Sequence, residues 1–141
     1  MKIIKSNVLL DTLQSDVRSV IFQCNQLNGL PGQLMTQTPA TGKWSVAQVL
    51  EHLNIYSRYY ITAIEDRLYL NQSGPDVFFK PGWLGNYFTK LMKPSEDKKL
   101  TKKMKAPKSA VPAPTPDAEA MLTECLQHQH HLLNLLQIAK T

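Results

Sequence analysis

Apolar residues recur every three or four positions along three stretches of the chain, which is the period of an amphipathic α-helix. The first stretch runs from Val8 to Leu27. The second opens at Ser45 and reaches Asn71, and the third restarts at Thr115. The pattern therefore predicts three long helices separated by long connections.

The second of these helices carries the most specific local signals. Ser45 is followed three residues later by Gln48, which is a capping box: the two side chains satisfy orphan backbone N–H groups reciprocally. Trp44 stands directly before the cap. Two adjacent apolar stripes give the helix a wide arc for burial, which favours an interior helix with at least two neighbours. The stripes are Val46, Leu50, Leu53, Ser57, Ile61, Ile64 and Leu68, and beside them Val49, His52, Tyr56, Tyr59 and Ala63.

Glycine and proline mark the connections between the helices. Gly29 and Pro31 end the first helix and predict a loop that lasts to about Lys43. Residues 78–92 are dense in aromatic side chains and predict a short helix packed across the bundle. Four prolines then predict an extended connection, and the hydroxyl of Thr115 caps the third long helix in front of a proline. No strand-like alternation or internal repeat is present.

These elements predict an all-α fold in a single domain over residues 1–141. Three helices joined by long connections leave one face of the middle helix open, and a fourth helix would complete the packing. The expected fold class is an up-down helix bundle of the four-helix type. Its fourth helix is missing from this chain or contributed by a partner.

Composition and charge narrow the classes of function. No apolar run is long enough to span a membrane and no signal peptide is evident, so we expect a cytoplasmic protein without a membrane partner. Cys24 and Cys125 have no zinc or CxxC spacing and are predicted to be reduced core residues. Residues 90–108 hold eight lysines against two acids, so the rest of the chain is nearly neutral. We interpret this lysine-rich segment, which includes Lys98 and Lys102, as a solvated loop, with an anionic partner as the alternative.

Residues 42–54 resemble the second-helix motif of the DinB-like superfamily, also called DinB/YfiT-like. Segments 81–88 and 103–108 are similar to one subgroup of it, so the resemblance covers most of the chain. It implies a four-helix bundle in which three histidines hold a divalent metal, zinc or nickel, and leave a position open to polarise a water or a thiol. The residues that match the motif are Trp44, Ser45, Gln48, His52 and Leu53.

By this resemblance His52 is the first metal ligand, and the other two come from an H-x-x-x-H pair on the last helix. No such pair exists in the sequence. His128 and His131 stand three residues apart but lie on the third long helix, where a polar helix shoulder is the competing interpretation. His52 has a competing interpretation too, as a hydrogen-bonded core histidine beside Tyr56 and Tyr59. A metal is expected in a longer form of the protein and not in this chain.

Two hypotheses of function follow. The first is a metal-dependent hydrolase or thiol-group transferase acting on a small molecule or a low-molecular-weight thiol, with His52 as one ligand of an incomplete three-histidine site. The second is a non-catalytic bundle that acts as a binding or dimerisation module, in which a homodimer covers the exposed stripes. We expect truncation of a longer chain to explain the missing helix, and loss of the site is the alternative.

The remaining reactive side chains support neither hypothesis. Cys125 and His128 lie one turn apart, but burial is the simpler interpretation of the thiol. Glu51 and Glu65 are interpreted as single carboxylates on a solvated helix face. No DNA-binding helix or RNA-binding sheet motif is evident, and no nucleic-acid partner is expected.

Overall fold

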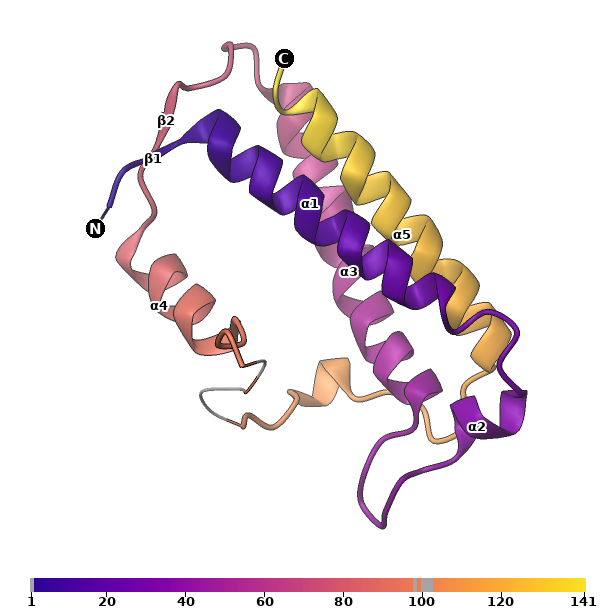
Figure 1. Cartoon of the computed structure of the whole chain (residues 1–141). Coiled ribbons are helices and arrows are strands. Elements are labelled where there is room, and N and C mark those ends of the chain that lie inside the picture. The colour runs from indigo at the N-terminus through magenta and orange to yellow at the C-terminus, as the bar shows by residue number, and fades with distance from the viewer. Residues whose placement is uncertain (1, 98, 100–102) are drawn as a thin grey trace.

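Three long helices form the body of the molecule in the computed structural model, which describes residues 2–97, 99 and 103–141 (Figure 1). They are α1 (Ser6–Asn25), α3 (Val46–Leu70) and α5 (Ala118–Ile138), and they confirm the all-α fold class. α5 packs against both α1 and α3, whereas in the described part of the chain α1 and α3 share no extensive contact of their own. This arrangement is a bundle of three long helices in which α1 and α3 each pack on α5.

Burial follows the predicted stripes on the faces that meet α5. One cluster joins Cys24 of α1, Leu50 of α3, and Leu122 and Cys125 of α5. Both cysteines are buried free thiols, as predicted. Burial of apolar surface stabilises the folded state by about 25 cal/mol per square ångström removed from water. This cluster therefore holds the three helices together.

The segment after α1 is not a plain loop as expected, because it contains the short helix α2 (Gly32–Thr36). Met35 of α2 is 4 % exposed and joins the same core cluster. A single buried side chain therefore anchors a connection whose glycines and proline otherwise indicate a turn. Sequence periodicity cannot detect a helix of this length, because five residues hold little more than one turn.

The third long helix begins two residues later than the predicted cap. Asp117 is the N-cap, and its Oδ1 accepts a hydrogen bond of 2.7 Å from the backbone N–H of Ala120. The expected cap at Thr115 is wrong, because the carboxylate of Asp117 is placed to satisfy a free N–H of the first turn and suits the positive end of the helix dipole.

A two-residue antiparallel ladder joins the N-terminus to the middle of the chain. β1 (Ile4–Lys5) pairs with β2 (Phe78–Phe79), with Ile4 opposite Phe79. Ser6 extends the ladder by donating its N–H to the carbonyl of Val77 at 3.0 Å. Strands of two residues are too short to show alternation, so hydrophobic periodicity could not predict them.

The aromatic segment forms α4 (Trp83–Met92), but the predicted packing across the bundle is wrong. α4, which the structure describes in full, has no buried residue and lies apart from the three long helices (Figure 1). The turn η1 (Lys108–Ala110) follows, and Ala110 is 2 % exposed against α3. Lys98 and Lys102 of the lysine-rich segment lie outside the described residues. None of the described helices is long and apolar enough to cross a membrane.

Candidate functional site around His52

The start of α3 fixes the position of His52. The backbone N–H of Gln48 donates to Ser45 Oγ at 3.2 Å, and the backbone N–H of Ser45 donates to Gln48 Oε1 at 2.9 Å. Both halves of the predicted capping box are therefore present. The side-chain amide of Gln48 also donates to the carbonyl of Ala113 at 3.3 Å, which ties the helix start to the connection before α5. His52 follows on the second turn of this capped helix.

A long-range hydrogen bond orients the imidazole of His52. Its Nδ1 lies 2.7 Å from the carbonyl oxygen of Ala110, 58 residues away in the chain. A carbonyl oxygen only accepts, so Nδ1 carries the proton. In the neutral ring Nε2 is then the unprotonated nitrogen, with a lone pair available to a metal ion or a hydrogen-bond donor. Metal-binding histidines commonly have their other nitrogen held in this way.

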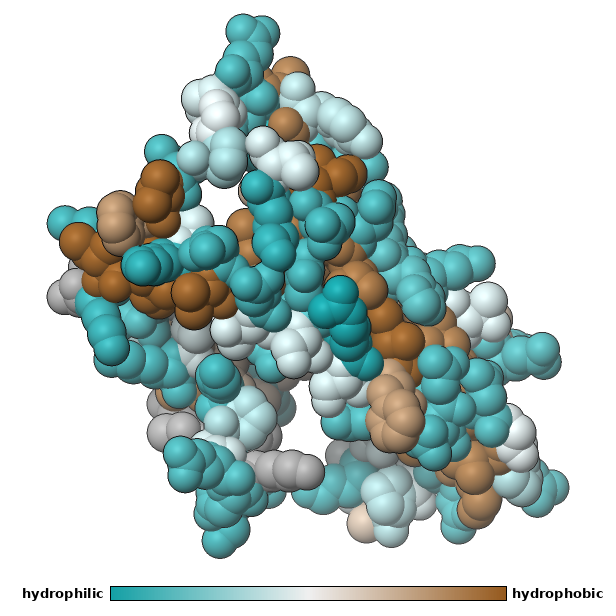
Figure 2. All heavy atoms as spheres, turned by 45° about the horizontal axis from the view of Figure 1, so that its top comes forward, coloured by the Kyte–Doolittle hydropathy of each residue, from teal (hydrophilic) through white to brown (hydrophobic). Residues whose placement is uncertain are grey.

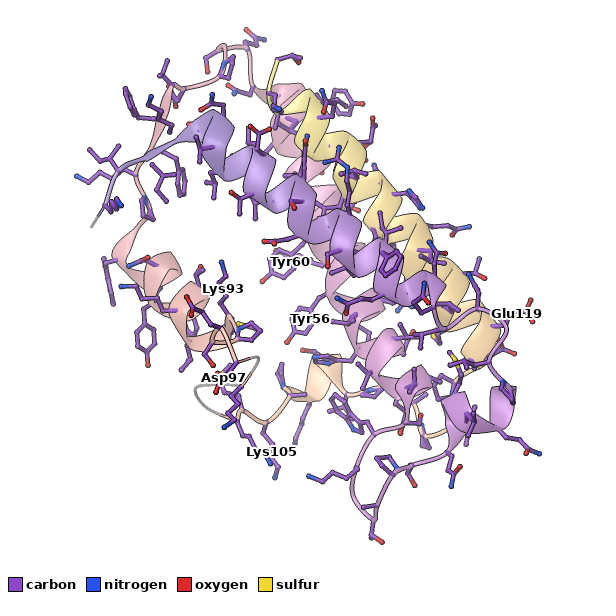
Figure 3. The ribbon with its side chains drawn as sticks, viewed as in Figure 1. Tyr56, Tyr60, Lys93, Asp97, Lys105 and Glu119 are labelled. Carbon is purple, nitrogen blue, oxygen red and sulfur yellow. The ribbon has the colours of Figure 1, made fainter. Side chains whose placement is uncertain are left out.

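Aromatic rings pack around the same imidazole. The centroid of the Trp44 ring lies 5.0 Å from that of His52, and the Tyr56 ring meets His52 edge-on at 5.1 Å. Tyr60 stacks on Tyr56 one turn further along, with centroids 6.2 Å apart. Figure 3 shows Tyr56 and Tyr60 projecting from α3 toward the side of the molecule where α4 lies. These rings restrict the rotation of His52 and exclude water from one side of it.

His52 lines a cleft of about 440 Å³ between α3 and the segment that leads from α4 to η1. Its walls are mostly apolar and aromatic, and His52 is half-buried. A volume of this size admits a small molecule, and a largely apolar wall with few polar groups is typical of ligand sites. The other lining residues are Trp44, Tyr56, Leu91, Met92, Met104, Lys105, Ala106 and Pro107.

The remaining histidines do not join His52. His128 Nε2 lies 3.0 Å from Glu124 Oε1, and His131 Nε2 lies 3.1 Å from Glu65 Oε1. These two imidazoles are therefore engaged by carboxylates of α5 and α3, whereas His52 contacts η1. Across residues 2–97, 99 and 103–141, no group of three or more His, Cys, Asp or Glu side chains is arranged to hold a metal. The described residues thus fit one ligand of a three-histidine site and do not fit the complete site.

A charged cluster that the sequence pattern did not predict joins α3 to α5. Arg58 donates to Glu124 from Nε at 2.6 Å and from Nη2 at 2.9 Å. Its Nη1 and Nη2 each donate to a carboxylate oxygen of Glu51 at 3.1 Å. The hydrogen bond from Arg58 lowers the pKa of Glu124 to about 2, and both carboxylates raise the pKa of Arg58 above its ordinary value. The prediction that Glu51 and Glu65 are isolated on a solvated face is therefore wrong, since Glu65 meets His131. Arg58 stands two turns after Glu51 on one helix face, a spacing that could have signalled half of the cluster.

The buried thiols do not supply a nucleophile. Burial, together with the neighbouring Cys24 thiol, raises the pKa of Cys125 to about 12. A thiol with so high a pKa stays protonated near neutral pH, and the thiolate is the reactive form. The burial of both thiols agrees with their predicted role as core residues.

Comparison with known proteins supplies the family. The model of the DinB superfamily matches residues 25–137, from the last turn of α1 to the end of α5. The chain belongs to the DinB superfamily. This match includes the capping box, His52 and η1, so it covers the residues that position the imidazole of His52. No curated protein and no solved structure matches the chain.

Proposed function

We propose that this DinB protein acts on a small molecule as a metal-dependent hydrolase or thiol-group transferase of the cytoplasm, with His52 as one ligand of a zinc or nickel ion. One observation carries the proposal: Nδ1 of His52, which lines the cleft, is 2.7 Å from the carbonyl of Ala110, so in the neutral ring Nε2 has a free lone pair. A metal in such a site would supply Lewis acidity to a bound water or thiol.

The described residues do not complete a coordination shell, so no catalytic step is assigned to them. Under this proposal the other ligands come from outside the described residues. The contribution of this chain is then to fix one imidazole by two contacts. The capped start of α3 sets its backbone, and Ala110 sets its ring orientation and protonation.

Metal binding at equilibrium tests the proposal without an activity assay. The purified full-length protein is dialysed against zinc or nickel, and bound metal and melting temperature are measured for the wild type, His52→Ala and His130→Ala. His130 is exposed and provides the matched control. A ligand present at about 100 times its Kd stabilises the folded state by about 2.7 kcal/mol. We expect stabilisation in the wild type and the control variant, and its loss in His52→Ala.

Two outcomes of this experiment would contradict the proposal. Bound zinc and nickel below roughly one-tenth per chain, with no rise in melting temperature, would rule out a metal role for this protein. If metal binds equally well to His52→Ala, the ligand assignment is wrong. Nitrogen NMR of the imidazole adds an independent readout, because the proposal requires the proton of His52 on Nδ1.

The open corner between α1 and α3 favours a second candidate, a non-catalytic bundle that forms a homodimer. Apolar side chains on both helices remain exposed along that corner, although α5 covers the rest of each stripe. A large exposed apolar patch commonly marks an interface. Under this candidate a second copy covers the side chains of Leu13, Val20, Val49, Leu53, Tyr60 and Ile64.

Light scattering after size exclusion, over a range of concentrations, measures this association. We expect the mass to correspond to a dimer, and Tyr60→Glu to shift it toward the monomer. Tyr69→Glu is the control, because Tyr69 is 70 % exposed on the same helix at its far end. A monomer at all concentrations, or an equal effect of the two substitutions, contradicts the dimer.

A further inference from the structure

α4 presents an apolar face that nothing in the described structure covers. Trp83 is 72 % exposed, Tyr87 57 % and Phe88 46 %. These side chains belong to a helix that lies apart from the three long helices (Figure 1). Exposed apolar surface of this extent is costly in water and commonly marks an interaction site.

The ladder beside α4 extends the same apolar surface. Phe78 and Phe79 of β2 are 58 % and 44 % exposed, and Val77 before them is 70 % exposed. Figure 2 shows hydrophobic side chains gathered on this side of the molecule, over the ladder and α4. We call residues 77–88 the aromatic ridge. The first residues of the ridge are held by β1 and by the hydrogen bond from Ser6 of α1 to Val77.

Positive charge lies within the aromatic ridge and in the segment that follows it along the chain. The described residues between 76 and 108 include seven lysines and only three acids, of which Asp97 already pairs with Lys99 at 3.6 Å. Lys90 stands seven residues after Trp83 and three after Tyr87, so all three share one edge of α4. The lysines are Lys80, Lys90, Lys93, Lys99, Lys103, Lys105 and Lys108.

We propose that the aromatic ridge and its flanking lysines bind the surface of an anionic phospholipid bilayer. Aromatic rings favour the boundary between headgroups and acyl chains, and lysines extend their apolar stems there while the ammonium groups meet lipid phosphates. This surface binding differs from membrane spanning, and it revises the sequence-based expectation that the protein has no membrane partner.

The shape of the surface favours a bilayer over an acidic protein. A protein partner needs a complementary surface, whereas a bilayer deforms around a convex helix and needs only apolar side chains beside positive charge. The far end of α4 is committed elsewhere, because Leu91 and Met92 line the His52 cleft. The membrane-facing part under this proposal is the first half of α4 with β2, because residues 77–88 do not line the His52 cleft.

Sedimentation with vesicles tests the proposal on the intact chain. Pure phosphatidylcholine vesicles are compared with vesicles containing about 30 mol% phosphatidylglycerol, at low and at high salt. The two test variants are Trp83→Ser/Tyr87→Ser and Lys90→Gln/Lys93→Gln. The controls are Phe22→Ser/Tyr69→Ser, which removes equally exposed rings from α1 and α3, and Arg18→Gln/Lys43→Gln, which removes charge elsewhere.

We expect binding to the anionic vesicles that weakens with salt, and little binding to the neutral ones. The lysine variant should lose roughly twenty-fivefold in affinity at low salt, because each of the two basic residues contributes about fivefold. The aromatic variant should lose about tenfold, and the two controls should bind like the wild type. All substituted residues are exposed, so unchanged helical content and melting temperature will confirm that every variant folds.

Three results would overturn the proposal. The first is equal binding to neutral and anionic vesicles, or none to either. The second is a control that loses as much affinity as its matched test variant. The third is retention of an acidic amphipathic peptide by the same surface while vesicles are ignored, which would identify a protein docking site instead.

Discussion

Replacing Arg58 by methionine tests the charged cluster that joins α3 to α5. Arg58 is hydrogen bonded to Glu51 on its own helix and to Glu124 on the other, so its removal breaks an interhelical contact and leaves two carboxylates facing each other. Methionine preserves much of the apolar stem and has a comparable helix propensity. The substitution therefore removes charge with little change in packing.

The expected magnitude follows from the pKa of Glu124 and the exposure of Arg58. The pKa of Glu124 falls from 4.5 to about 2. One pKa unit corresponds to about 1.4 kcal/mol, so the shift limits the coupling to roughly 3 kcal/mol. The Arg58 side chain is 45 % exposed, and water and salt screen the pair. We expect Arg58→Met to lower the free energy of unfolding by about 1 to 2 kcal/mol at pH 7.

Urea denaturation followed by circular dichroism measures the change, and pH tests its origin. Glu124 has a lower pKa in the folded chain than in the unfolded chain, so its stabilisation is complete above about pH 4.5 and is lost as the pH falls toward 2. The difference between wild type and Arg58→Met should shrink over the same interval. High salt at pH 7 should reduce the difference as well.

Two controls decide whether charge is responsible. Arg18→Met removes an exposed arginine from α1, and a double-mutant cycle with Glu124→Gln isolates the interhelical pair. The reasoning is refuted if Arg58→Met destabilises the protein no more than Arg18→Met does. It is also refuted if the full effect persists at pH 2 and in high salt, because the contribution of Arg58 would then come from packing.

Two further predictions concern α3. Ser45→Ala removes the acceptor for the backbone N–H of Gln48 and should lower the free energy of unfolding by about 1 kcal/mol in chemical denaturation, and an unchanged midpoint would contradict the role of the cap. Asn54 is fully buried and donates to the carbonyl of Met121 at 3.0 Å, so Asn54→Ala should cost about 2 to 3 kcal/mol. At pH 7 Asn54→Asp should lower the free energy of unfolding more than Asn54→Ala does, because the ionised carboxyl places a charge in the core. At pH 4 this difference between the two variants should be smaller. The same difference at both pH values would contradict the prediction.

The long helices and the start of α3 could be predicted because their causes are local. The capping box needs only Ser45 and Gln48, three residues apart, and the stripes of α1, α3 and α5 need only a period of 3.6. The family resemblance at residues 42–54 likewise depends on a short pattern. For the same reason sequence analysis assigned the α5 cap to Thr115, because local patterns cannot rank two neighbouring capping side chains.

The extent of burial could not be predicted, because it depends on what is available to cover each stripe. The wide arc of α3 led us to expect at least two neighbours along its length. α5 covers one side of the arc, yet Val49, Leu53 and Tyr60 on the other side remain exposed. The aromatic segment shows the same limit, since its apolar pattern predicts a helix but not whether the bundle offers α4 a place to pack.

The sequence by itself determined the helical class, the DinB motif and the position of His52 on the second turn of a capped helix. Only the tertiary structure decided the chemical state of that histidine, because the carbonyl that holds its Nδ1 proton belongs to Ala110, 58 residues away. It also separated His128 and His131 from His52 by pairing them with Glu124 and Glu65. Local patterns specify backbone hydrogen bonds and periodicity, whereas the partner of a side chain depends on which distant segments pack together.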